Sequence, residues 1–198
     1  IYPTYGSKIT LTTKMTFPYS VWGEKVQGKT YDYENMSDQE RFDWVEYFKV
    51  KFTAEWYTPL NRHKERQFVL ANKVGFGFLG TYNNKLGESP FERFYLGGVF
   101  LSGFLLDGRE IVNLRGYDDL ALTFPSDRVG SPVIAKYSTE LRYPLSTNPN
   151  ATIYALGFLE AGNTWTGLKD FSPFNLYRSG GMGLRIFLPM FGLLGFDY

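Results

Sequence analysis

Long stretches in which polar and apolar residues alternate constrain this chain more than any other feature. The first, residues 8–17, has Lys or Thr at every even position and mainly apolar residues at the odd positions. A period of two indicates a β-strand with one polar and one apolar face, and no helical period fits it. Comparable segments occupy 47–57, 66–79, 133–143, 152–165 and 177–188, and a seventh begins at Leu193. The sequence therefore predicts an all-β fold of about seven strands.

The lengths of these strands and of their connections favour a membrane barrel. Strands of about 10 to 13 residues suit a tilted crossing of a bilayer, whereas strands in soluble proteins average about 5 to 6 residues. The connections alternate between long (18–46, 80–131, 164–176) and short (59–65, 144–151, 189–192). Long loops on one side and short turns on the other are typical of an antiparallel outer-membrane β-barrel, whose long loops are extracellular.

The main alternative is a soluble sandwich or lipocalin-like barrel, which would also alternate. Such a fold seldom needs Lys and Glu repeated along the whole polar face of strands this long. Aromatic residues, 19% of the chain, cluster at the strand ends, where membrane-interface girdles belong. The chain has no apolar run long enough for a transmembrane helix. No signal peptide opens it, and its last residues read as an interrupted strand, so we expect a fragment of a longer protein.

The residues that usually carry catalysis are scarce. The chain has no cysteine, and its one histidine, His63, lies in a predicted charged turn where solvent exposure is the usual outcome. The glycines at 180, 181 and 183 lie inside a strand with no lysine after them, so they do not form a phosphate loop. No cluster has metal-ligand spacing, and a net charge of +1 does not favour nucleic acid. We expect no enzymatic activity, no catalytic residue, no metal and no cofactor.

The predicted inner strand faces carry three ionisable residues of interest, Glu140, Glu160 and Arg185. If the strands at 133–143 and 152–165 are antiparallel neighbours, both carboxylates project into the lumen at similar heights. Two carboxylates facing one cavity require a cation, and Arg115, on the longest loop, is the candidate, since a guanidinium can bind both. Gly116 beside it permits a sharp backbone turn. The alternative is that Arg115 is an ordinary solvated loop residue.

An ordered set of short motifs spans nearly the whole chain. They are PTYGS at 3–7, FYLGG at 94–98, LRGY at 114–117, STELRYP at 138–144 and FLEAGNTW at 158–165. In this order they resemble the second half of the barrel of the BamA family of outer-membrane assembly insertases. That family shares a superfamily with TamA-like assembly factors and two-partner secretion transporters.

The resemblance implies a sixteen-stranded barrel, of which residues 1–198 would be the C-terminal part without the periplasmic domains and seam strands. It also implies that the extracellular loop at 80–131 folds back into the lumen. The loop motif Arg115, Gly116 and Tyr117 would be pinned there by Glu140 and Glu160. Two departures from the family are a glutamate at position 160, where relatives often carry aspartate, and an insertion at 99–111.

The function implied by the resemblance is the folding and insertion of β-barrel proteins into the outer membrane, as core subunit of the assembly machinery. Its partners would be outer-membrane lipids, unfolded outer-membrane clients and accessory lipoproteins, with no nucleic acid. Its location would be the outer membrane, as a multi-pass barrel. A TamA-like factor or a two-partner secretion transporter shares the loop motif and stays open as an alternative. A passive porin or uptake channel and a soluble lipid-binding barrel are alternatives of another class.

Overall fold

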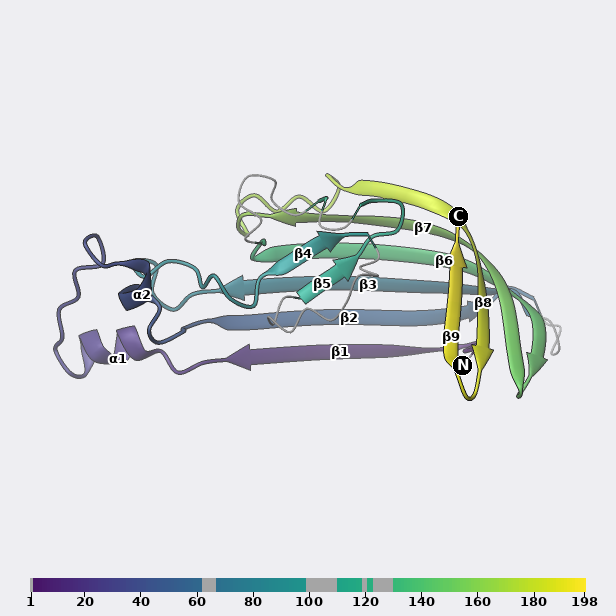
Figure 1. Ribbon diagram of the computed structural model, residues 1–198, viewed down its shortest axis with the longest axis horizontal. Helices are drawn as coiled ribbons and strands as arrows, with labels where there is room; N and C mark the ends of the chain where they lie inside the picture. The colour runs from purple at the N-terminus through teal and green to yellow at the C-terminus, as the bar shows by residue number, and fades with distance from the viewer. Residues whose placement is uncertain (1, 62–66, 99–109, 119–120, 123–129) are drawn as a thin grey trace.

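The all-β prediction is confirmed: seven antiparallel strands form one curved sheet, in the order β1-β2-β3-β6-β7-β8-β9 (Figure 1). The computed structural model describes residues 2–61, 67–98, 110–118, 121–122 and 130–198. The strands of the sheet are β1 (Gly6–Met15), β2 (Phe48–Pro59), β3 (Val69–Gly80), β6 (Val133–Asn148), β7 (Ala151–Trp165), β8 (Tyr177–Leu188) and β9 (Gly192–Asp197).

Alternation of residues along each strand separates an inner from an outer face of the sheet. The inner face is the one over which the long loop folds, and it carries Lys and Glu on β2, β3, β6 and β7. The outer face carries apolar side chains that stay exposed within this chain, such as Ile9, Leu11, Leu159 and Met182. An apolar outer face and a polar inner face are the arrangement of a membrane barrel wall, the reverse of a soluble one.

The predicted end of the strand at 133–143 is wrong. The turn expected at 144–151 is much shorter, because β6 continues past Pro144 to Asn148 and β7 begins at Ala151. The register shifts between Pro144 and Ser146, which marks a bulge. A proline that cannot donate to the ladder is tolerated at such an irregularity.

The described residues of the segment 80–131, expected to be irregular, include two short strands. They are β4 (Phe94–Gly97) and β5 (Glu110–Asn113), and they pair in parallel as a separate two-stranded sheet. Both lie over the inner face of the large sheet (Figure 1). Their apolar side chains form a buried cluster with the wall, made of Leu79, Phe94, Leu96, Leu114 and Ile134.

A glycine on β3 makes room for this cluster. A methyl group on Gly77 would lie 2.5 Å from the Phe94 ring and 2.9 Å from Ile134, closer than real contacts allow. The missing side chain therefore lets the loop lie directly against the wall.

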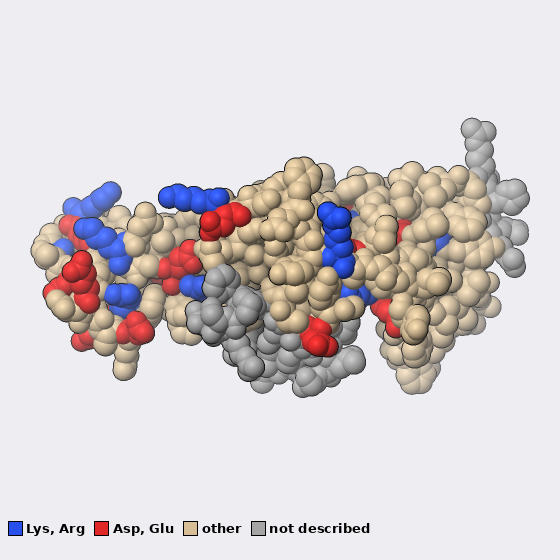
Figure 2. All heavy atoms as spheres, turned by 90° about the horizontal axis from the view of Figure 1, so that it is seen from above, with Lys and Arg blue, Asp and Glu red and all other residues tan. Residues whose placement is uncertain are grey.

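The long connection at 18–46 projects from the end of the sheet to which the β4–β5 loop is also joined (Figure 1). It contains the helices α1 (Tyr19–Lys25) and α2 (Asp38–Arg41), the second with a capping box between Ser37 and Glu40. Charged side chains of both signs are concentrated at this end of the molecule (Figure 2). Among the described residues, no helix is long and apolar enough to cross a membrane.

Candidate functional site

Arg115 lies between the two carboxylates that the sequence singled out. Its Nη2 donates to Glu140 Oε1 at 2.6 Å and to Glu160 Oε1 at 2.8 Å. Its backbone N–H donates to the second oxygen of Glu160 at 3.0 Å. The structure thus brings Arg115, Glu140 and Glu160 together, and Glu160 binds both the side chain and the backbone of the loop.

The strand register explains why the two carboxylates converge. Glu160 on β7 lies opposite Ser138 on β6, while Glu140 lies opposite Phe158. The glutamates are therefore diagonal neighbours on the inner face of two adjacent strands, within reach of one planar guanidinium.

Four further side chains complete the site and were not singled out from the sequence. Lys136 Nζ lies 3.0 Å from Glu160, and Ser138 donates to the same carboxylate at 3.1 Å. Arg142 contacts Oε2 of Glu140, the oxygen that Arg115 does not contact, through Nη2 at 2.7 Å and Nε at 2.8 Å. The Arg115 guanidinium carbon stands 3.8 Å from the centre of the Phe158 ring, in cation–π contact. All four lie on the predicted inner faces of their strands, and this position is the sequence feature that could have identified them.

The site is largely shielded from water within the described residues. The side chain of Arg115 is 11% exposed, and that of Glu160 is 3% exposed. Burial disfavours the charge of Arg115, but the hydrogen bonds and charges of Glu160 and Glu140 outweigh it and raise the pKa of Arg115 above its ordinary value. A buried ion pair of this kind is costly to break on one side only.

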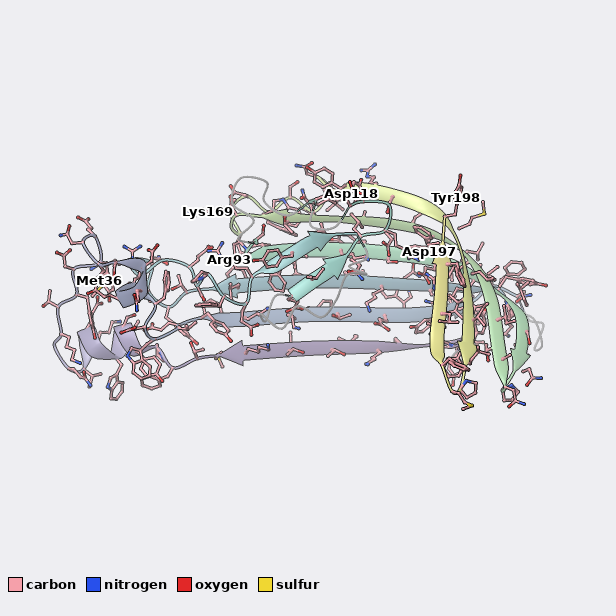
Figure 3. The ribbon with its side chains drawn as sticks, in the orientation of Figure 1. Met36, Arg93, Asp118, Lys169, Asp197 and Tyr198 are labelled. Carbon is pink, nitrogen blue, oxygen red and sulfur yellow. The ribbon has the colours of Figure 1, made fainter. Side chains whose placement is uncertain are left out.

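The two residues after Arg115 shape the tip of the loop. Gly116 has φ +82°, the left-handed region that glycine enters at no steric cost. The Tyr117 hydroxyl donates to the carbonyl of Arg178 on β8 at 2.8 Å, and its ring meets Tyr177 edge-on. Asp118, labelled in Figure 3, follows, and its carbonyl accepts from Gly98 N–H at 2.9 Å. The tip therefore contacts three adjacent strands.

Of the remaining sequence candidates, Arg185 reaches this cluster only through Asp197, whose carboxylate lies 3.8 Å from Arg115 Nη1. Arg185 binds Asp197 on β9 through two hydrogen bonds of 2.7 and 2.8 Å (Asp197 is labelled in Figure 3). His63 and the greater part of the insertion at 99–111 lie outside the described residues. Within the described part of the chain, no cluster of His, Asp and Glu could hold a metal ion.

A cavity of about 480 Å³ separates the loop from part of the wall. Its lining includes Glu140, Glu160 and Lys136 at one side and Lys51 and Glu110 at the other. The cavity therefore connects the Arg115 site with a second group of charges on β2.

Comparison with known proteins agrees with this fold and with the family that the motifs indicated. The crystal structure of BamA from Haemophilus ducreyi lacking POTRA domains 1–3 matches the whole chain with a TM-score of 0.65 at 20% sequence identity. The chain spans 35% of the length of that protein, and at this identity the match establishes the fold. The model of the Omp85 superfamily domain matches residues 1–198. The chain, with its inner wall of charged strands and its loop anchored through Arg115, belongs to the Omp85 superfamily.

Proposed function

We propose that this chain is part of the barrel of an outer-membrane insertase that folds and inserts other β-barrel proteins. The observation that carries the proposal is the loop held by Arg115 between Glu140 and Glu160. A buried, doubly anchored loop restricts free passage through the lumen, which suits a machine that controls access to its lumen. The superfamily assignment and the BamA-like fold support the same reading.

The role proposed for this part of the barrel is positional. We propose no enzymatic step for it; among the described residues, no group of His, Asp and Glu could hold a metal ion. The polar inner wall would hold the loop, and the apolar outer face would contact outer-membrane lipid. Unfolded clients and accessory lipoproteins are the other proposed partners, and the outer membrane is the proposed location.

The test uses the full-length protein carrying Arg115→Ala or Glu160→Ala, expressed in cells from which the wild-type copy is depleted. Either change removes a partner of a shielded ion pair, so the loop loosens. We expect faster proteolysis within 110–118 and a reduced amount of folded client barrels in the outer membrane.

Lys73→Ala is the matched control, because the Lys73 ammonium pairs with Glu55 on the neighbouring strand at 2.7 Å rather than with the loop. It should leave both readouts at the wild-type level. Unchanged loop proteolysis together with normal client assembly in both anchor variants would refute the proposal.

A polypeptide transporter of the same superfamily is the second candidate, because the loop anchor suits it equally well. A loosened loop with normal client assembly, but with loss of secretion of a passenger polypeptide, would favour the transporter. A large steady ion conductance in the wild-type protein would favour a porin.

A further inference from the structure

A second group of charges joins the loop to the wall, with the opposite polarity to the Arg115 site. Here the wall supplies cations: Lys14 on β1, and Lys49 and Lys51 on β2. The loop supplies anions: Glu92 before β4, and Glu110 at the start of β5.

Each of the two carboxylates is shared between two lysines. Glu92 lies 3.2 Å from Lys14 and 3.1 Å from Lys49. Glu110 lies 2.7 Å from Lys49 and 2.9 Å from Lys51. The result is a continuous row of alternating charges across two strands and the loop.

The wall alone would not favour this arrangement. Lys14 and Lys49 are direct cross-strand partners, and Lys51 follows Lys49 on the same face of β2. Like charges at such positions repel each other. The side chain of Lys49 is also fully buried, with its ammonium 4.4 Å from the centre of the Phe94 ring. A buried ammonium is costly unless it is paired, so these three positions are built around an anion.

We propose that Lys14, Lys49 and Lys51 form a carboxylate-binding site on the inner wall, which the loop occupies with its own Glu92 and Glu110. When these carboxylates are removed or displaced, the site takes carboxylate anions from the lumen. Lys51 and Glu110 line the cavity described above, so a small anion reaches this end of the site without displacement of the Arg115 anchor. The inference needs only a barrel in a bilayer, so its failure is separable from failure of the proposed insertase function.

The experiment measures single-channel conductance and ion selectivity of the full-length protein in planar bilayers with a KCl gradient. Glu110→Gln removes the charge shared by Lys49 and Lys51 while keeping the side-chain shape. We expect the chloride-to-potassium permeability ratio to rise at least about twofold, because the Lys51 ammonium loses its carboxylate partner and attracts anions into the lumen. Citrate, as the carboxylate probe, should then block the current of this variant and leave the wild-type current unchanged.

The matched control is Glu88→Gln, which changes the net charge equally. The Glu88 carboxylate belongs to the loop and pairs with Arg93 at 3.5 Å rather than with a lysine of the wall. The Glu88→Gln variant should therefore show no citrate block. Adding Lys51→Met to Glu110→Gln should abolish the block. The double change Glu92→Gln/Glu110→Gln should strengthen it.

Two results would overturn the inference. One is an unchanged permeability ratio in Glu110→Gln. The other is a raised ratio without citrate block, because a change of net charge alone then accounts for the selectivity. If the double variant fails to fold, Glu110→Gln alone still decides, since it leaves the Lys14–Glu92–Lys49 contacts in place.

Discussion

Replacing Arg115 by alanine should release the loop tip from the wall without unfolding the wall. The change removes two charge-assisted hydrogen bonds, of 2.6 and 2.8 Å, and the stacking on Phe158. Neither carboxylate is left without a cation, because Lys136 stays beside Glu160 and Arg142 stays beside Glu140.

These remaining partners set the magnitude. Breaking a buried pair by removing one side costs about 3–5 kcal/mol when the other charge is stranded. Since both glutamates keep a cation, we expect a loss no larger than the lower end of that range, about 3 kcal/mol of loop-closing free energy. Each 1.4 kcal/mol is about tenfold in an equilibrium constant, so the open fraction of the loop should rise by at most about 100-fold.

Amide hydrogen exchange measures this directly, since the exchange rate of a protected amide follows its local opening equilibrium. The amides to follow are Gly98, which donates to Asp118, and residues 110–118. The control amide is Leu79, which donates to Pro132 in the wall at 2.7 Å and should exchange as in the wild type. Exchange at Gly98 and 110–118 that stays within about threefold of the wild type would contradict the estimate. It would mean that the β4–β5 packing and the ion pairs of Glu92 and Glu110 hold the loop without Arg115.

Three further perturbations test separate parts of the same geometry. Gly116→Ala should speed exchange at the tip about tenfold, because left-handed backbone costs a residue with a Cβ roughly 1–2 kcal/mol; the new methyl group itself would lie 3.5 Å from Ser179, an ordinary contact. Phe158→Leu should weaken the anchor by about 1 kcal/mol through loss of the cation–π contact, and a double-mutant cycle should show that this part of the loss vanishes in the Arg115→Ala background. Burial opposes the charge of Glu110, but its two lysine partners outweigh this and hold its pKa below the ordinary 4.5. Because the folded-state pKa is lowered, the Glu110 carboxylate stabilises the closed loop above pH 4.5, and this contribution is lost as the pH falls through the lowered pKa. Protection of the β5 amides should therefore decline below that pH, and the decline should be shallower in Glu110→Gln, measured by exchange across a pH series.

The sheet was predictable from the sequence because each strand has two faces in different surroundings. On β6, Lys136, Ser138, Glu140 and Arg142 recur at every second residue, so their common face could be read directly. The near alignment of Glu140 with Glu160 followed from the short connection between their strands. The exact length of that connection did not follow, because the bulge after Pro144 lets the ladder continue where proline normally ends it.

The inner structure of the loop was not predictable in the same way. β4 has the sequence FYLG and is buried along its whole length, so it shows no alternation. β5 has only four residues and pairs in parallel with β4, the strand that precedes it in the chain. Short apolar runs of this kind do not distinguish a strand from other buried structure. Which inner-face cation approaches Glu160 depended on this loop, so Lys136 could not be selected in advance.

Gly77 lies where the loop contacts the wall, so a substitution there can affect the loop and leave the strand pairing of the wall unchanged. Its backbone pairs with Lys51 on β2 and Ile134 on β6, so a side chain there leaves the ladder intact. That side chain would instead occupy the space of Phe94, the residue through which the loop lies on the wall. A bulky residue at this one position would therefore displace Phe94 from the wall while the strands of the wall keep their register. The properties of the wall could then be measured separately from those of the loop contact at Phe94.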